Sequence, residues 1–417
     1  MRDIVITLIV FGSLPFILKR PFTGLVMWTW LSLMNPHRLA WGFSLRFPFA
    51  EIVFITTVLS YVMSQDTKKI PFSREVVVLI VFVLWMFITT VFSLSPDYAW
   101  LQWDKIWRIQ LGILLTLMLT SDRKRIEILV WTIAISLGFY GYKGGIWTVL
   151  SGGANRVYGP DGTFIGGNNE LGLALVMTVP LIWYLVMSTK QRWPRLGLYG
   201  AMIFTPIAII GTHSRGAMVG LVAMGMVFLL KSRKRLIPLL IAVALVCAMP
   251  VLMPQSWFDR MSTINTYEQD QSAMERLDAW QAAYVLANKR FHGGGFGAVI
   301  FVNGTDAHSI YFQILGEQGY PGLGIFLLLG GMAYSKAKYV QKKAGSDPEL
   351  KWAQDLALMI QVSLVGYATC GAFLGLGYFD FFYLLVALVV VLERTIRAPQ
   401  ALFAKQVGGI SALRATT

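Results

Sequence analysis

The sequence predicts an all-α polytopic integral membrane protein with about 12 transmembrane helices. Of its 417 residues, 56% are hydrophobic and only 14% are charged, and the mean hydropathy is +0.59. Soluble proteins carry about 25% charged residues. The apolar residues form runs, many of them close to the roughly 20 residues that an α-helix needs to cross a bilayer. Because backbone polar groups must be satisfied within lipid, we expect these runs to be helical.

Apolar runs follow one another along the chain, and one long polar stretch interrupts them. The candidate spans are 4–18, 22–34, 47–63, 76–94, 106–120, 126–149, 170–188, 196–211, 216–230, 236–253, 309–333, 355–374 and 378–393. The first two runs are short and are separated only by Lys19, Arg20 and Pro21. They form one broken helix, a hairpin or two crossings, and the count of 12 is therefore given to within one. The N-terminus shows no small-residue cleavage site, so we expect a retained anchor.

The polar stretch divides the chain into four parts. We predict a helix bundle over residues 1–253, a loop over 254–308 and further membrane helices over 309–397. The remaining residues, 398–417, are expected to be a disordered tail. Within the loop, residues 273–289 show a helical pattern with an apolar face. That face carries Met274, Leu277, Trp280, Tyr284 and Ala287. The pattern is typical of an amphipathic helix lying on the membrane surface.

The distribution of Lys and Arg predicts the orientation. Alternate connectors together with the C-terminal tail hold 22 of these residues, whereas the opposite connectors hold 10. The richer set should be cytoplasmic, and the C-terminus with it. Residues 35–46, 150–169, the tight turn at Arg215 and the 254–308 loop then face the opposite, outer side.

Composition excludes several functional classes. The net charge of +14 does not indicate nucleic-acid binding, because basic residues collect in cytoplasmic connectors and no nucleic-acid-binding motif accompanies them. Cys247 and Cys370 lie inside apolar runs, which argues against a disulfide framework. No metal-ligand spacing appears in the outer loops, so we predict neither a metal nor another cofactor.

Two residues on the outer side are the main candidates for chemistry. Arg215 lies in a short turn, Gly211–Gly216, between two apolar runs. It could simply extend from a helix end to the surface, but a guanidinium there could also hold a diphosphate bidentately. His308 lies where the long loop meets the next span. It could be a hydrogen-bonded interface residue, or a base that takes a proton from a hydroxyl.

Three further residues could contribute to substrate binding. His213 lies two positions before Arg215, Arg276 lies near the start of the loop helix, and Arg156 adds positive charge to the 151–169 loop. The glycine cluster 293–297 lacks the Lys-Ser/Thr ending of a phosphate-binding loop. We expect it to let the chain turn tightly beneath the site.

Several motifs resemble those of the O-antigen ligase and polymerase superfamily. They are Asn168-Asn169-Glu170-Leu171, Gly211-Thr212-His213-Ser214-Arg215-Gly216-Ala217, Glu275-Arg276-Leu277-Asp278-Ala279-Trp280, and the stretch from Ala307-His308-Ser309-Ile310 to Gly319. The similarity extends from about residue 120 to 390. The opening of the chain, up to Leu39, also resembles a subgroup of O-glycosylation ligases associated with the exosortase system.

The resemblance implies a metal-independent inverting glycosyltransferase in the inner membrane of a Gram-negative bacterium, with its site facing the periplasm. The donor would be an undecaprenyl-diphosphate-linked glycan, and the acceptor a sugar hydroxyl of lipid A-core, both surrounded by membrane lipids. His308 would activate the acceptor hydroxyl and Arg215 would bind the donor diphosphate. Arg156, Arg276 and His213 would assist in substrate binding.

Other functions remain open. A polymerase or a protein O-glycosylation ligase of the same superfamily would share these motifs, and the single long outer loop favours the ligase. A transporter of lipid-linked glycans would show charged residues near the middle of several spans and a repeat architecture. The predicted span interiors are nearly free of charge, and we see no repeat, so the transporter ranks last.

Overall fold

The computed structural model describes residues 1–64, 70–231, 239–240, 243–244, 247–250, 253–262, 271–345 and 347–414. Every regular element within these ranges is helical, which confirms the all-α prediction. The α-helices are α1 (Arg2–Lys19), α2 (Pro21–Met34), α3 (Phe49–Met63), α4 (Arg74–Val91), α5 (Pro96–Leu119), α6 (Arg123–Leu150), α7 (Asn168–Ser188), α8 (Arg192–Gly211), α9 (Arg215–Lys231), α11 (Gln255–Ser262), α12 (Gln271–Lys289), α13 (Ala298–Asn303), α14 (Ile310–Ala344), α15 (Lys351–Gly371) and α16 (Asp380–Arg414). Short 3₁₀ helices are η1 (Pro36–Leu39), η2 (Phe43–Leu45) and η4 (Pro348–Leu350).

Helix starts follow local chemistry that is visible in the sequence. Ser73 caps α4 by accepting a hydrogen bond from the Val76 amide, and Asp122 caps α6 in the same way from Arg125. Pro21 and Pro96 occupy the first positions of α2 and α5, where a missing N–H costs nothing. Most helices begin within a few residues of the predicted spans, but α5 begins at Pro96, well before the predicted run 106–120.

Three of the described helices are long and apolar enough to cross a membrane: α4, α7 and α8. The shorter α3 is also apolar. The count of about 12 spans stays a prediction, and the predicted span at 236–253 lies largely outside the described residues.

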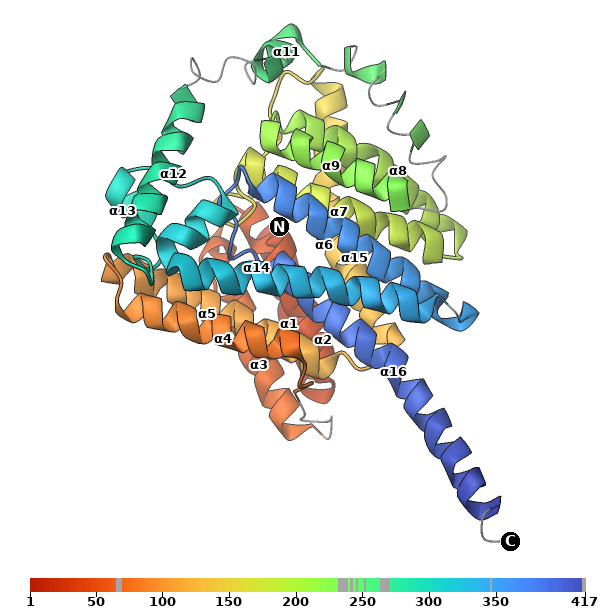
Figure 1. The fold of residues 1–417 in the computed structure, drawn as a ribbon. Coiled ribbons are helices and arrows are strands. Elements are labelled where there is room, and N and C mark those ends of the chain that lie inside the picture. The colour runs from red at the N-terminus through yellow and green to blue at the C-terminus, as the bar shows by residue number, and fades with distance from the viewer. Residues whose placement is uncertain are drawn as a thin grey trace.

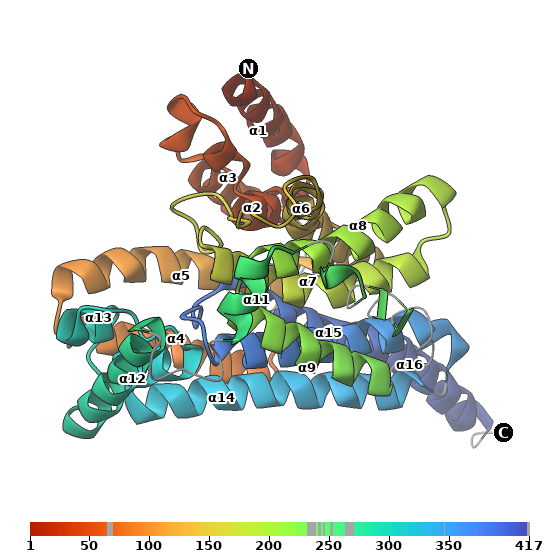
Figure 2. The same ribbon diagram turned by 90° about the horizontal axis from the view of Figure 1, so that it is seen from above.

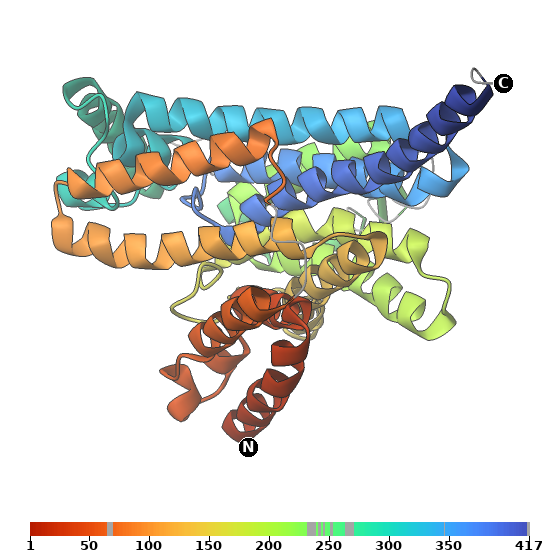
Figure 3. The ribbon, with the colours of Figure 1, turned by 90° about the horizontal axis from the view of Figure 1, so that it is seen from below.

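Helices α4, α5, α14 and α15 run side by side, and α12 and α13 gather at one end of them (Figure 1). Helix α7 is buried almost throughout, from Leu171 to Val186, as expected for a helix that is apolar on every face. It packs on α6, α8, α9 and α15. Helices α1, α2 and α3 project together from this bundle (Figure 2 and Figure 3).

The first two apolar runs form two separate helices. Arg20 takes an extended conformation between α1 and α2. The Arg2 guanidinium donates to the Leu39 carbonyl (3.0 Å), whereas the Ile17 carbonyl accepts from Ser60 Oγ at the far end of α3 (2.6 Å). Helix α1 therefore runs antiparallel to α2, and Lys19 and Arg20 lie beside the end of α3.

Helix α16 is drawn through Arg414, and it extends past the bundle (Figure 1). The division of the chain at residue 397 and the disorder of 398–417 stay predictions. Ala, Leu, Gln and Lys, which are good helix formers, continue the helical pattern there. Residues 415–417 lie outside the described residues.

The loop helix α12 is present as predicted, but it buries a different face. Its buried side chains include Ala279, Ala283 and Leu286, whereas Met274 and Tyr284 are exposed. Small residues allow the helix to approach the 307–312 segment closely. Part of the predicted apolar face therefore packs against the protein, and the rest is exposed. Hydrophobic periodicity does not distinguish lipid-facing from protein-facing residues.

Candidate functional site

The turn that carries Arg215 is held by the 151–167 loop. His213 lies in this turn with a positive φ of 55°, and its Nε2 is 2.9 Å from the Gly153 carbonyl oxygen. Asn168, at the start of α7, donates its side-chain amide to the Thr212 carbonyl (2.8 Å). These contacts fix the backbone immediately before Arg215, which is the first residue of α9.

The beginning of the long loop covers the same turn. Trp257 on α11 is buried and donates Nε1 to the carbonyl of Ile210 at the end of α8 (3.3 Å). Its ring forms an apolar cluster with Ile210 and Met253, against which Met218 of α9 packs. The 254–308 loop thus begins beside Arg215 and ends at His308.

His308 lies in a short non-helical segment before α14. Its φ is +44°, a value that is uncommon for a residue with a Cβ and is often found at functional sites. Its Nδ1 is buried and lies 4.0 Å from Asp306 Oδ2, whereas 40% of the His308 side chain is exposed. The exposure therefore falls on the other atoms of the ring, and Nδ1 faces the carboxylate.

Asp306 is a residue to which the sequence assigned no role. Burial raises the pKa of its carboxyl, while the neighbouring His308 lowers it. A carboxyl group two residues before a histidine can hold the imidazole in one orientation. The two residues are near neighbours in the sequence, but their facing arrangement depends on the turn between them.

The helix α12 fixes the His308 segment from one side. Trp280 Nε1 donates to the Ala307 carbonyl (2.7 Å). The indole also stacks on Phe312, with ring centroids 4.9 Å apart and planes 8° apart. Two of the motifs that the sequence singled out, 275–280 and 307–319, therefore meet directly.

The glycine cluster 293–297 packs against α14, the helix that follows the His308 segment. Helix α14 is kinked at Gly319 (φ 67°, ψ −171°), and Pro321 follows. Because Pro321 has no N–H, the Glu317 carbonyl loses its helical donor, and it accepts from the Gly295 amide instead (2.8 Å). Gly294 donates to the Gly316 carbonyl in the same way (2.9 Å). The chain therefore turns tightly at the glycine cluster and packs against the kink of α14.

A buried polar network joins the kink to the loop between α15 and α16. Glu317 Oε1 accepts from the Gly297 amide (2.9 Å), and Oε2 accepts from the Tyr378 hydroxyl (2.7 Å). Gln313 Oε1 accepts from the Gly377 amide (3.1 Å). Residues 372–379, which we call the α15–α16 loop, are thereby tied to the first turns of α14.

The same loop borders both catalytic candidates. A Cβ placed on Gly216, next to Arg215, would lie 3.1 Å from Phe373 Cβ. A Cβ placed on Gly375 would lie 2.4 Å from Asp306 Oδ2. The start of α9 and the His308 segment are therefore neighbours of one short loop, although about 90 residues separate them in the sequence.

The remaining predicted residues occupy different positions. Arg156 is exposed and lines a cavity of about 420 Å³ together with Lys143, Trp147 and Tyr158. Arg276 is half-buried on α12, on the side of the helix that faces the protein. His213 is buried in its turn. The roles of all five predicted residues remain predictions.

A further cavity lies elsewhere, and the sequence did not indicate it. It has a volume of about 790 Å³ and lies between α2, α3, α5 and the 151–167 loop. Its lining includes Arg38, Arg46, Lys105 and Arg108. Nothing in the sequence spacing of these residues indicates that they lie together.

Comparison with known families supports the resemblance in the second half of the chain. Residues 200–327 match the family model described as O-Antigen ligase. Residues 1–190 match a family of unknown function (DUF5935). No curated protein matches the chain. The first match includes Arg215, Arg276 and His308, whereas Arg156 falls within the second.

Proposed function

We propose that this chain is an O-antigen ligase. Residues 200–327 match the O-Antigen ligase family. The enzyme transfers a glycan from undecaprenyl diphosphate to a sugar hydroxyl of lipid A-core, in the inner membrane and on its periplasmic face. No metal or nucleotide takes part. The observation that carries the proposal is that one family match includes Arg215, Arg276 and His308, and that the α15–α16 loop borders the segments of Arg215 and His308.

His308 acts as the base. Its Nδ1 faces Asp306 at 4.0 Å, so Nε2 on the exposed side of the ring takes the proton of the acceptor hydroxyl. The acceptor oxygen then bonds to the anomeric carbon of the donor sugar. In-line attack breaks the bond from that carbon to the diphosphate oxygen and inverts the configuration.

Arg215 stabilises the leaving group. The electron pair of the broken bond stays on the diphosphate, and a guanidinium can hold two of its oxygens with parallel hydrogen bonds. Arg276 and Arg156 add positive charge to the diphosphate site, and His213 supports the turn that carries Arg215. Removing such a contact typically reduces the rate by about 10²- to 10³-fold.

The testing experiment is transfer in vitro with purified protein, undecaprenyl-diphosphate-linked glycan and lipid A-core, without added metal or nucleotide. Glycan should appear on lipid A-core, and the His308→Ala and Arg215→Ala variants should lose this activity. His292→Ala is the matched histidine control: the His292 ring packs edge-on against Phe92, with ring centroids 6.1 Å apart, and this variant should retain transfer.

Two results would contradict the proposal. If the lipid-linked donor grows longer and lipid A-core stays unmodified, the enzyme is a polymerase. If folded protein transfers glycan to neither acceptor, the enzymatic interpretation is wrong, and transport of the lipid-linked glycan becomes the leading hypothesis.

A further inference from the structure

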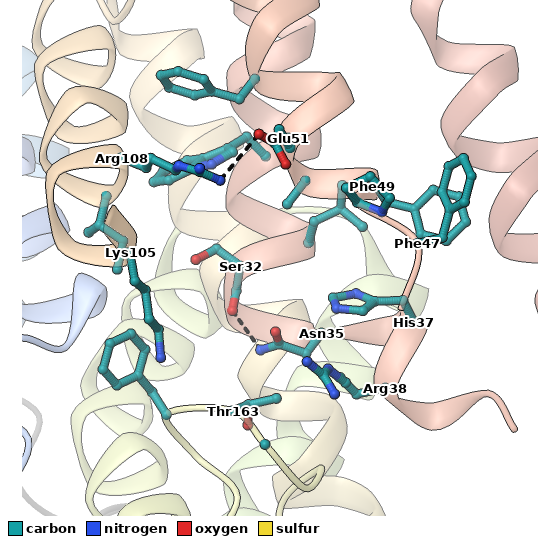
Figure 4. Close-up of a pocket in the computed structure, with 18 of the residues that line it drawn as sticks. Ser32, Asn35, His37, Arg38, Phe47, Phe49, Glu51, Lys105, Arg108 and Thr163 are labelled. Carbon is teal, nitrogen blue, oxygen red and sulfur yellow. Dashed lines mark hydrogen bonds and ion pairs between the residues drawn. The ribbon is translucent and has the colours of Figure 1, made fainter. Parts of the chain in front are cut away.

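The cavity of about 790 Å³ lies within residues 1–190, outside the O-antigen ligase match. Figure 4 shows Arg38 and His37 on one side and Lys105 on α5 opposite them, with the loop carrying Thr163 between. Gly162 allows the Arg38 guanidinium to approach this loop, since a Cβ there would lie 3.3 Å from Arg38 Nη1. Arg38 and Lys105, which are distant in the sequence, therefore line the same cavity.

Of the four cations that line this cavity, only Arg108 forms an ion pair within the described residues. Arg108 is neutralised by Glu51 (3.3 Å) and Asp104 (2.8 Å). Among the described residues, Arg38, Arg46 and Lys105 form no ion pair and no side-chain hydrogen bond. The Lys105 ammonium lies 3.5 Å above the Phe164 ring, and Asp380 is the acid that acts on it electrostatically.

One buried uncharged polar atom of the cavity lining also lacks a partner among the described residues. His37 Nδ1 is buried without a hydrogen bond to any described residue. Asn35, which lines the cavity, has a positive φ of 49°. Of the described residues, only three other than glycine have a positive φ, and the other two are His213 and His308. Asn35 is the C-cap of α2, a position where asparagine commonly adopts this conformation.

The wall of the cavity also contains apolar side chains. Phe54 and Ile55 of α3 and Trp28 of α2 line it, and Ile55 is exposed. The helices α2 and α3 belong to the part of the chain that we expect to lie in the membrane. A ligand with an anionic head and an apolar chain would match both the charged and the apolar parts of this lining.

We propose that this cavity binds a phosphoryl anion, carried on a membrane lipid or free in solution. Arg38 and Arg46 offer forked donors that fit phosphate oxygens, and Lys105, opposite Arg38, adds a point charge. The cavity is separate from Arg215 and His308, but it is linked to their surroundings: Phe164 in its wall contacts Phe379 of the α15–α16 loop, with ring centroids 6.2 Å apart. The inference does not depend on the transfer reaction.

Binding is measured with the full-length protein in detergent micelles, by calorimetry. One arm uses inorganic pyrophosphate. The second uses dioleoyl phosphatidic acid in mixed micelles, with dioleoylglycerol as the uncharged lipid control. Arg38→Gln and Lys105→Gln should each weaken binding by about tenfold or more, as expected for the loss of a hydrogen bond to a charged group. Lys289→Gln removes an exposed cation of α12 and should leave binding unchanged.

Charge-conserving Lys105→Arg should retain most of the binding and shows that the site tolerates substitution. Comparable affinity in both arms indicates a free phosphoryl ligand, and tighter binding of phosphatidic acid indicates a lipid. Binding that is insensitive to Arg38→Gln and Lys105→Gln, or that falls equally in Lys289→Gln, overturns the proposal. So does the absence of binding in both arms. Because no glycan is transferred in this assay, its failure is distinguishable from failure of the ligase proposal.

Discussion

Trp280 is the side chain that links α12 to the segment carrying His308. It contributes one hydrogen bond, from Nε1 to the Ala307 carbonyl, and one stacked contact, on Phe312. Substitution by phenylalanine removes the hydrogen bond and keeps an aromatic ring. Substitution by alanine removes both. The two variants therefore separate the contribution of the bond from that of the stack.

The magnitudes follow from these contacts. Ala307 is fully buried, so its carbonyl would lose its partner without gaining water, at a cost of about 1–2 kcal/mol. The stack contributes about 1 kcal/mol more. Local opening of residues 306–309 should become roughly tenfold more frequent in Trp280→Phe and roughly fiftyfold more frequent in Trp280→Ala.

Hydrogen exchange of the backbone amides of residues 306–310 measures this opening directly. Exchange in α7 serves as the internal reference, because α7 lies far from the substitution in the buried centre of the bundle. If the proposed function is correct, transfer falls in the same order, since a displaced base reacts slowly. Equal exchange at 306–310 in the wild type and in both variants would refute the reasoning that Trp280 holds the His308 segment.

Two further predictions concern the kink and the basic cavity. Gly319→Ala should abolish folding or lower stability by several kcal/mol, because its φ is +67° and a Cβ would lie 2.1 Å from the Phe291 carbonyl oxygen. Gly331→Ala on the same helix meets nothing within 4 Å and should be neutral, so similar melting temperatures of the two variants would contradict this account. Burial, with a smaller effect of Arg38, lowers the pKa of His37 from 6.5 to about 4. The unfolded chain then binds a proton that the folded chain does not, so stability falls as pH drops from about 6.5 to about 4, by up to about 3 kcal/mol. The melting temperature of His37→Asn should lack this dependence, and parallel curves for the variant and the wild type would exclude it.

The sequence alone determined where most helices lie. Lipid offers no partners for backbone groups, so each apolar run must satisfy its own hydrogen bonds. Run 126–149 accordingly became α6, and run 196–211 became the apolar part of α8. The motifs around Arg215 and His308 were also visible, because both lie at helix starts where a polar residue interrupts an apolar run.

The tertiary structure decided which of these elements meet. Hydrophobic periodicity placed Trp280 and Met274 on one face of α12, but only packing showed that Trp280 contacts the His308 segment while Met274 is exposed. Likewise, only the folded structure shows that the amides of Gly294 and Gly295 donate to the Gly316 and Glu317 carbonyl groups at the kink of α14.

The basic cavity shows the limit of the sequence most clearly. Arg38, Lys105 and Gly162 are far apart in the chain, and each looks like an ordinary residue of a connector or a helix end. The charges of Arg38 and Lys105 act together only because α2, α5 and the 151–167 loop pack around one cavity. A sequence records the sign and position of each charge, whereas the interaction between charges depends on distances that folding sets.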